Sequence, residues 1–221
     1  SIDIFISKLC ETLIFEYPIL KHYSFFSEEN DYSELKFPAL ILDPIDGTKE
    51  LSMGIGECAL SLALFNSAKL SDPVNYSLIF NPFTGFQIDS LTIFTPPKSY
   101  YRDNLRGLVS ISEWERGLFS NHMNRTNFKR MDTNENASIT PFGSIAFKLA
   151  LLSNGACDFI VSLQPKNIRD IAAGTHLADL HGFNFYEGKN LIKSLDKEKY
   201  YPPLCWCRKQ DVDHISSVYF P

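Results

Sequence analysis

Residues 39–48 read ALILDPIDGT and form the most informative stretch of the chain. The apolar run 39–42 predicts a short buried strand, because an apolar run between turn residues is typical of a strand inside a core. The strand is expected to end at Asp43 and Pro44, since proline fixes φ and removes a backbone donor. Gly47 then allows a backbone N–H group to approach a ligand closely.

Asp43 and Asp46 place two carboxylates three residues apart in this turn. Two such groups repel each other unless a cation lies between them. Magnesium suits the position because it takes hard oxygen ligands, including a backbone carbonyl such as that of Ile45. The alternative interpretation is an ordinary aspartate-rich turn in which Asp43 caps the next helix.

Length and composition indicate a globular protein with one large domain or two closely joined ones. The chain has 221 residues, of which 44% are hydrophobic and 21% charged, and its net charge is −5. A mildly acidic surface argues against partners such as nucleic acid polymers or anionic membranes. No basic leader and no long apolar window are visible, which favours a cytoplasmic protein. Binding of an anion would need a local cation.

The periodicity of the sequence predicts alternating helices and strands without strict βαβ order, which favours layered sheets and helices. A weak boundary near residues 98–107 suggests subdomains at 1–105 and 106–221. Taken alone, Asp170 would be interpreted as a helix N-cap and His176 as a structural histidine. Helices are expected at 3–16, 147–153 and 170–180, and strands at 39–42, 58–65, 76–80 and 159–161.

Three separated motifs follow one another in a fixed order: Ser27-Glu28-Glu29, Asp43 to Thr48, and Ile168 to Gly174. They resemble those of the inositol monophosphatase superfamily of magnesium-dependent phosphomonoesterases. The resemblance implies an αβαβα sandwich, with α+β and α/β character, like that of fructose-1,6-bisphosphatase. Between the second and third motifs, a glycine–serine turn opens a predicted helix, as in the family. This intervening stretch runs from Gly143 to Asp158.

The resemblance implies a site of two or three magnesium ions. Glu28, Asp43 and the Ile45 carbonyl would bind the first ion. Asp43, Asp46 and Asp170 would bind the second. Two such ions can contact both the attacking and the leaving oxygen of a phosphate ester.

Further roles follow from the same resemblance. Glu28 and Thr48 are expected to be catalytic, with Thr48 orienting a metal-activated water. Asp3, on the first predicted helix, is assigned to pair with the Thr48 hydroxyl. The backbone N–H groups of Gly47 and Thr48 are expected to bind phosphate oxygens at a turn or helix start. Substrate contacts are also assigned to Gly143, Ser144, Lys49 and Lys148.

The substrate class is suggested by the residues around these motifs. Lys49-Glu50-Leu51 is similar to the 3′(2′),5′-bisphosphate nucleotidase branch. Leu163 stands where inositol-specific members carry a glutamate that accepts from sugar hydroxyls. These residues favour a nucleotide such as 3′-phosphoadenosine 5′-phosphate, with Lys49, Lys148 and Lys166 as contacts for its second phosphate. The alternatives are an inositol 1-phosphate or sugar phosphatase, and a degenerate member that binds without catalysis.

Some features depart from the family pattern. Arg169 replaces the tryptophan that usually precedes Asp170, and it could disturb this ligand or form a new ion pair. The resemblance also implies a helical segment with a lysine-bearing loop ahead of the position of Asp3, and this numbering does not contain it. Lithium sensitivity and a homodimer are further expectations from the family.

Overall fold

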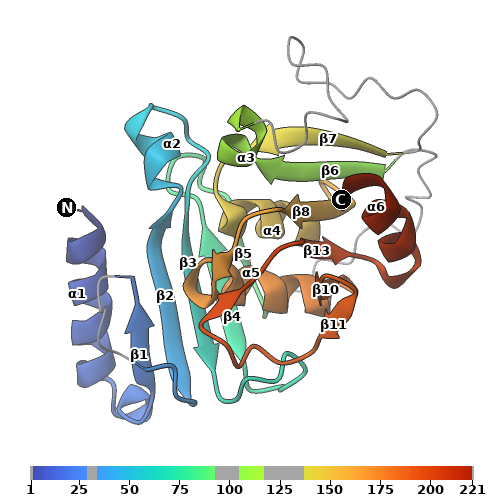
Figure 1. Cartoon of the computed structure of the whole chain (residues 1–221). Coiled ribbons are helices and arrows are strands. Elements are labelled where there is room, and N and C mark those ends of the chain that lie inside the picture. The colour runs from blue at the N-terminus through green and yellow to red at the C-terminus, as the bar shows by residue number, and fades with distance from the viewer. Residues whose placement is uncertain (1, 29–33, 93–104, 117–136, 221) are drawn as a thin grey trace.

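The computed structural model describes residues 2–28, 34–92, 105–116 and 137–220, which form two large sheets and a two-stranded one, with helices between and outside the large sheets (Figure 1). The first sheet has the order β1-β2-β3-β4-β5. β1 and β2 are parallel, and the remaining pairs are antiparallel. Its strands are β1 (Ser24–Ser27), β2 (Ala39–Asp46), β3 (Ala59–Phe65), β4 (Tyr76–Phe80) and β5 (Gln87–Asp89).

The second sheet has the order β11-β10-β13-β8-β6-β7 and mixes parallel with antiparallel pairs. Every strand of this sheet lies at or after residue 105, whereas those of the first sheet precede it. The division into two subdomains stays a prediction. The strands are β6 (Leu105–Ser110), β7 (Ala137–Phe142), β8 (Phe159–Ser162), β10 (Asn184–Glu187), β11 (Asn190–Ile192) and β13 (Leu204–Cys207).

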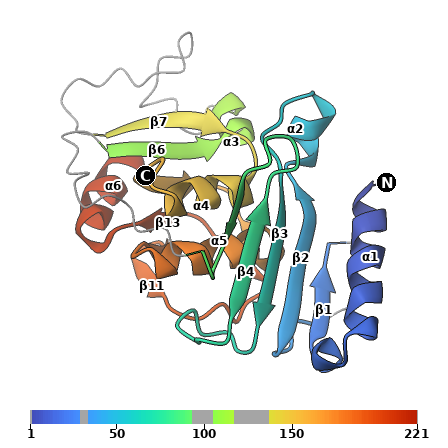
Figure 2. The same ribbon diagram turned by 180° about the vertical axis from the view of Figure 1, so that it is seen from behind.

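Three layers of helix enclose and separate the sheets, as Figures 1 and 2 show from opposite sides. α1 (Ile2–Glu16) covers the outer face of the first sheet. α4 (Ile145–Ser153) and α5 (Ile168–Leu180) lie between the two sheets. α6 (Val212–Tyr219) covers the outer face of the second sheet. The predicted αβαβα sandwich is therefore confirmed.

Side-chain alternation along the strands produces these layers, because successive residues of a strand point to opposite faces. In β2, Ile41 packs in the central core with α4 and α5, while Leu40 and Leu42 face the α1 side. In β8, Ile160 points to the central core, while Phe159 packs toward α6. Both sheets are thus covered on both faces.

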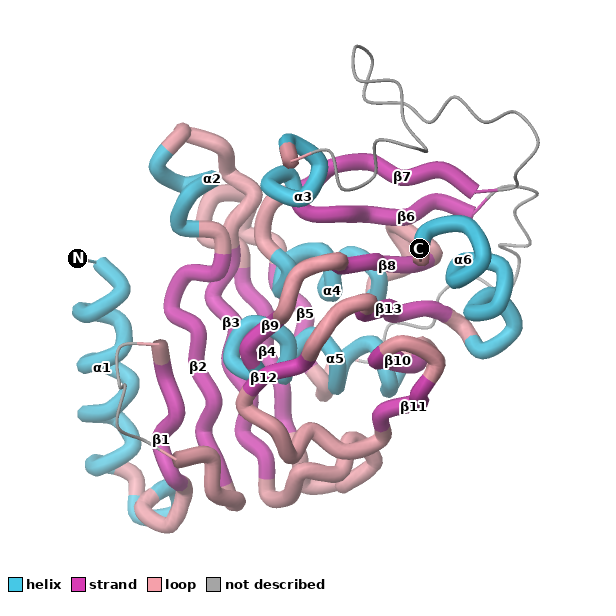
Figure 3. The backbone as a smooth tube through the Cα atoms, viewed as in Figure 1, coloured by secondary structure: helices cyan, strands magenta, loops and turns pink. Residues whose placement is uncertain are grey.

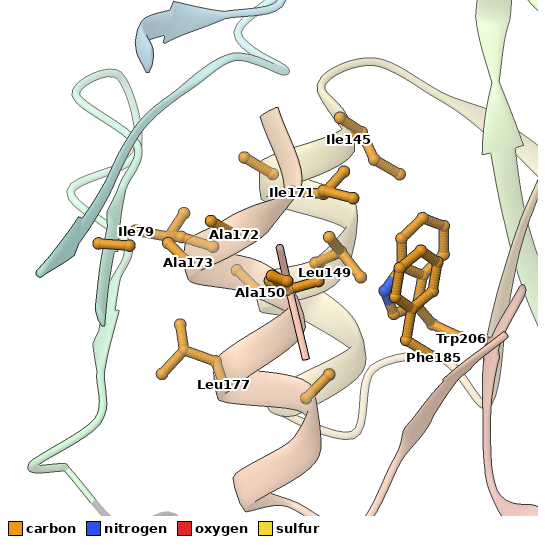
Figure 4. Packing of buried hydrophobic residues seen from close by; sticks show 14 of the residues in the cluster. Ile79, Ile145, Leu149, Ala150, Ile171, Ala172, Ala173, Leu177, Phe185 and Trp206 are labelled. Atoms are coloured by element: carbon orange, nitrogen blue, oxygen red, sulfur yellow. The ribbon is translucent and has the colours of Figure 1, made fainter. Parts of the chain in front are cut away.

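The central core depends on close packing between α4 and α5, shown in Figure 4. Gly174 of α5 lies against Leu149 of α4, and a Cβ added at Gly174 would be 2.4 Å from the Leu149 Cβ. Where the second sheet faces these helices, the rings of Phe185 and Trp206 stack with centroids 4.5 Å apart. The Trp206 indole N–H is satisfied by the Thr175 hydroxyl at 2.9 Å. This packing fixes the start of α4 relative to the start of α5.

Short elements connect the layers, and Figure 3 labels four of them, α2, α3, β9 and β12. Two of them follow strands near the carboxylate turn: α2 follows β2, and α3 follows β6. In the described part of the chain, no helix has the length and apolarity needed to cross a membrane. The short elements are η1 (Pro18–Leu20), α2 (Thr48–Ser52), α3 (Ile111–Glu115), β9 (Lys166–Asn167), β12 (Lys199–Tyr200) and η3 (Lys209–Asp211).

The predicted helices and strands are present, with longer bounds in several cases. β2 continues past the predicted stop at Asp43 as far as Asp46, and its register against β3 shifts between these two residues. α4 begins two residues earlier than predicted, at Ile145, and α5 begins at Ile168. Asp170 is consequently not the N-cap of α5: Asn167 holds that position. Most of the predicted boundary near 98–107 lies outside the described residues.

Candidate active site

The turn at the end of β2 is held in shape by hydrogen bonds between its own side chains and backbone. The Ile45 N–H donates to Asp43 Oδ1 at 3.0 Å, and the Thr48 hydroxyl donates to the Ile45 carbonyl at 3.0 Å. Gly47 adopts a φ of 95°, and a Cβ there would lie 3.0 Å from the Glu57 carbonyl oxygen. Glycine is therefore required at this position for two reasons, the left-handed backbone and the close approach of the next loop.

Four carboxylates from three segments come together at this turn. Glu28 directly follows β1, and the parallel pairing of Ser27 with Leu42 brings it beside Asp43. Asp43 is only 3% exposed. Burial raises the pKa of Asp43 well above its usual range, and the negative charges of Asp46, Asp170 and Glu28 raise it further. The site thus concentrates acidic groups that repel one another.

Asp170 reaches the cluster from the first turn of α5. It occupies the third helical position, where its Oδ2 accepts from the Asn167 N–H at 3.2 Å in a capping box. Burial and the charge of Asp46 raise the pKa of Asp170 to about 7, although Arg169 and Lys166 act in the opposite direction. Its carboxylate therefore serves the helix start and also belongs to the acidic cluster.

Asp46 is bound by the start of α4. Its Oδ2 accepts from the Ser144 hydroxyl at 2.5 Å and from the Ala146 N–H at 2.6 Å. Ser144 Oγ also accepts from the Phe147 N–H at 2.9 Å, which caps the helix. The positive end of α4 thus stabilises the Asp46 charge. In this way the structure joins Asp46, a predicted metal ligand, to Ser144, a predicted substrate contact.

Arg169 lies among the carboxylates. One terminal nitrogen of its guanidinium is 3.5 Å from Glu28 Oε1, and its Nε is 3.8 Å from Asp170 Oδ1. Replacement of the expected tryptophan has therefore produced new ion pairs. The pairing could not be read from the sequence, because Arg169 and Glu28 are far apart along the chain.

Lys148 is completely buried and faces the loop that precedes α4. Its ammonium donates to the Phe142 carbonyl at 3.1 Å and to the Gly143 carbonyl. Burial lowers the pKa of Lys148 to about 8. Its position in the apolar sequence IAFKLALLS was a signal for burial. The structure places this predicted substrate contact on backbone carbonyls, where it holds the Gly143–Ser144 turn.

Glu57 also holds this turn, and no motif in the sequence pointed to this residue. Its Oε2 accepts from the Gly143 N–H at 2.7 Å, and its carbonyl accepts from the Ser144 N–H at 3.0 Å. A Cβ at Gly143 would lie 2.5 Å from the Glu57 carbonyl oxygen, so only glycine fits there without a shift. The loop after α2 and the loop before α4 are thereby fastened together.

Three further predicted site residues, Lys49, Lys166 and Asp3, make no described contact with the four carboxylates. Lys49 of α2 pairs with Glu115 of α3 at 3.0 Å, and both side chains are more than half exposed. Lys166 lies 3.8 Å from the completely buried Glu113, which accepts from the Ser162 hydroxyl at 2.5 Å. Asp3 belongs to α1, but its side chain lies outside the described structure.

The donor set fits a hard divalent cation. Glu28, Asp43, Asp46, Asp170 and the Ile45 carbonyl offer only oxygen, and the mutual repulsion of the four acids is what a cation would relieve. Within residues 2–28, 34–92, 105–116 and 137–220, no three acidic, histidine or cysteine side chains converge closely enough to hold a metal as they stand. Asp46 binds the start of α4 instead, and Glu28 and Asp170 pair with Arg169.

Known proteins share both sequence and fold with this chain. Fructose-1,6-bisphosphatase of Pyrococcus furiosus is 34% identical over 149 residues, which make up 63% of this chain and 51% of that protein. The chain thus spans about half the length of this relative. The IMPase of Thermotoga maritima superposes with a TM-score of 0.74 at 17% identity, covering 99% of this chain and 82% of that one.

CysQ from Bacteroides thetaiotaomicron, a bacterial member of the inositol monophosphatase family, superposes with a TM-score of 0.60 at 18% identity. The match covers 90% of this chain and 80% of that one. At these identities the likeness of the solved structures establishes the shared fold. The sequence model of the inositol monophosphatase family matches residues 6–182, far more than half of the chain. The chain therefore belongs to the inositol monophosphatase family, which is a family of phosphoric monoester hydrolases.

Proposed function

We propose that this chain is a magnesium-dependent phosphomonoesterase that hydrolyses a small phosphate ester. The observation that carries the proposal is the gathering of four acids, Glu28, Asp43, Asp46 and Asp170, from three segments at one partly buried turn. The burial and the neighbouring negative charges that raise the pKa of Asp43 and Asp170 are costly for folding, so they favour a functional explanation.

Magnesium would be held by these four carboxylates and the Ile45 carbonyl. When bound, it would neutralise the phosphate dianion and promote ionisation of a water molecule near neutral pH. The protein's own part is to place the ligands: α4 orients Asp46, and the capping box orients Asp170. An acidic protein could then bind an anionic substrate through a local positive charge.

Thr48 is proposed to position the attacking water. Its hydroxyl hydrogen is committed to the Ile45 carbonyl, so the oxygen lone pairs can accept a hydrogen bond from water. The backbone N–H groups of Gly47 and Thr48, directly after Asp46, are the proposed phosphate contacts. Asp3 is the proposed partner of Thr48. Because a carboxylate only accepts, this pairing requires the hydroxyl hydrogen to turn from the Ile45 carbonyl to Asp3.

The favoured substrate is a 3′(2′),5′-bisphosphate nucleotide such as 3′-phosphoadenosine 5′-phosphate. Leu163 cannot accept from sugar hydroxyls, and the side chains of Lys49 and Lys166 retain some exposure. These two lysines are the proposed contacts for the second phosphate. The buried Lys148 would act through the turn that it holds.

A sugar phosphate is the second candidate. The relative from Pyrococcus furiosus is named fructose-1,6-bisphosphatase and is 34% identical over 149 residues. Inositol 1-phosphate and fructose 1,6-bisphosphate therefore belong in the same test as the nucleotide.

The experiment measures phosphate release with magnesium from each of the three substrates and compares kcat/KM. We expect the nucleotide to be preferred by at least about tenfold, with Asp46→Asn giving the background rate. Preference for either sugar phosphate would overturn the nucleotide assignment. If the native protein releases phosphate from all three substrates no faster than Asp46→Asn does, a binding protein without catalytic activity would be favoured. Lithium is expected to inhibit by competing at the magnesium site.

A further inference from the structure

We propose that the positively charged Arg169 side chain occupies the Glu28–Asp170 side of the carboxylate cluster. A divalent metal ion that binds there must displace this side chain. Arg169 would thereby set the metal affinity of this protein. The inference rests on the proposed metal site, and it concerns a residue that departs from the family motif.

The backbone of Arg169 is held in place, and its guanidinium group lies between two carboxylates. It is the second residue of α5, and its carbonyl accepts from the Ser61 hydroxyl of β3 at 3.4 Å. Its guanidinium reaches Glu28 at 3.5 Å on one side and Asp170 at 3.8 Å on the other. One side chain therefore pairs with carboxylates of the first and third motifs at once.

The charge of Arg169 acts where a metal charge would act. Its guanidinium lies within 4 Å of both Glu28 and Asp170, two of the proposed metal ligands. The arginine side chain is 22% exposed, so these pairs are only partly screened by water. It thus partly relieves the repulsion among the acids.

The contacts of Arg169 are loose enough for exchange. Arginine–carboxylate pairs of high affinity are bidentate, with donor–acceptor distances of about 2.7–2.9 Å. Both distances here are longer, and among the described residues the buried Nε of Arg169 has no hydrogen-bond partner. The guanidinium is therefore held by charge more than by directed bonds, and a metal ion offers Glu28 and Asp170 a stronger partner.

Two effects of opposite sign follow for Arg169→Gln, which removes the charge and keeps a polar side chain. Without metal, the acids repel each other more, so the variant should unfold at a lower temperature than the native chain. With magnesium, no arginine has to be displaced, so the variant should bind magnesium about tenfold more tightly. A merely structural role for Arg169 would lower the unfolding temperature without tightening magnesium binding.

The test titrates magnesium chloride into the native protein, Arg169→Gln, Arg169→Lys and Lys21→Gln by calorimetry, with thermal unfolding scans at zero and saturating magnesium. Lys21→Gln is the matched control. It makes the same change in net charge at an exposed residue ahead of β1, at the opposite end of that strand from Glu28. Arg169→Lys keeps the charge and should stay within about threefold of native affinity.

Tighter magnesium binding and a larger magnesium-induced rise in unfolding temperature, for Arg169→Gln alone, would support the inference. Equal or weaker binding by Arg169→Gln, with the native protein binding magnesium, would overturn the inference and leave the proposed function intact. If Arg169→Gln does not fold, the Arg169→Lys variant decides. An unfolding temperature and a magnesium affinity close to native would support the need for a positive charge at this position. Loss of magnesium binding by a folded Arg169→Lys protein would overturn the displacement model. Absence of binding by every folded form would overturn both proposals.

Discussion

The Ser144 hydroxyl donates a 2.5 Å hydrogen bond to Asp46, and this contact joins the end of β2 to the start of α4. The two residues are 98 positions apart, yet the Ala146 N–H binds the same carboxylate oxygen. One oxygen of Asp46 is thus fixed by the first turn of a buried helix. The orientation of this acid depends on the packing of α4, which the central core determines.

Ser144→Ala should reduce activity by loosening Asp46. The Ala146 N–H would remain, so we expect kcat/KM for phosphate release to fall about tenfold. Stability should fall by about 1 kcal/mol, since Ser144 is also the N-cap of α4. Ser153→Ala, in the last turn of the same helix, is the control and should keep native activity. Equal activity losses in both variants would show that the helix as a whole, not the Asp46 contact, is responsible.

Gly174→Ala should destabilise the protein by about 1–3 kcal/mol, because the added methyl would overlap Leu149 and force α4 and α5 apart. Urea unfolding measures the loss. Gly56→Ala is the control, since a Cβ there would lie 3.5 Å from the Phe83 Cβ, an ordinary contact distance. A Gly174 variant as stable as the Gly56 variant would contradict the close packing of the two helices.

Lys148→Met tests whether this lysine holds the loop or contacts substrate. The change leaves the Phe142 and Gly143 carbonyls without their donor, so stability should fall by about 2 kcal/mol in urea unfolding. Because the turn carries Ser144, which holds Asp46, kcat should fall together with the stability. Native stability together with a selectively raised KM would instead assign Lys148 to the substrate.

His176 should make stability depend on pH. It is almost fully buried, pairs with the Ser77 hydroxyl at 2.9 Å, and packs edge-on against Phe65. Burial lowers the pKa of His176 to about 4 from its usual 6.5. Between these two values the unfolded chain binds the proton and the folded chain does not, so stability falls as pH drops from 6.5 toward 4.

This linkage predicts that the native chain loses about 2 kcal/mol more than His176→Gln does when the pH falls from 7 to 5. Urea unfolding of both proteins at the two pH values measures the difference. Parallel losses in the two proteins would show that the folded and unfolded chains protonate His176 alike.

Local sequence was enough to predict the strand before Asp43, the helix after Gly143 and the layered fold, because each follows from apolar spacing and turn residues. It was less reliable for helix ends. The N-cap of α5 is Asn167, and the pair Asn167 and Asp170 at capping-box spacing was a readable signal for it.

Contacts between distant segments could not be predicted. Arg169 meets Glu28, and Glu57 meets Gly143, only because the sheets and helices bring their loops together. Glu113 reads as a surface residue of a short polar helix, yet it is completely buried beside Ser162. Such burial depends on tertiary packing, which a single sequence does not encode in its local pattern.

The central claim is that the buried Asp43 and the half-buried Asp46, at the end of β2, bind the magnesium that hydrolysis requires. The most direct test measures phosphate release from 3′-phosphoadenosine 5′-phosphate as magnesium is added to the native protein, to Asp43→Asn and to Asp213→Asn, a change on the distant helix α6. We predict release that rises and saturates with magnesium for the native and Asp213→Asn proteins and falls at least about a thousandfold for Asp43→Asn. Equal, magnesium-independent release by all three proteins would contradict the claim.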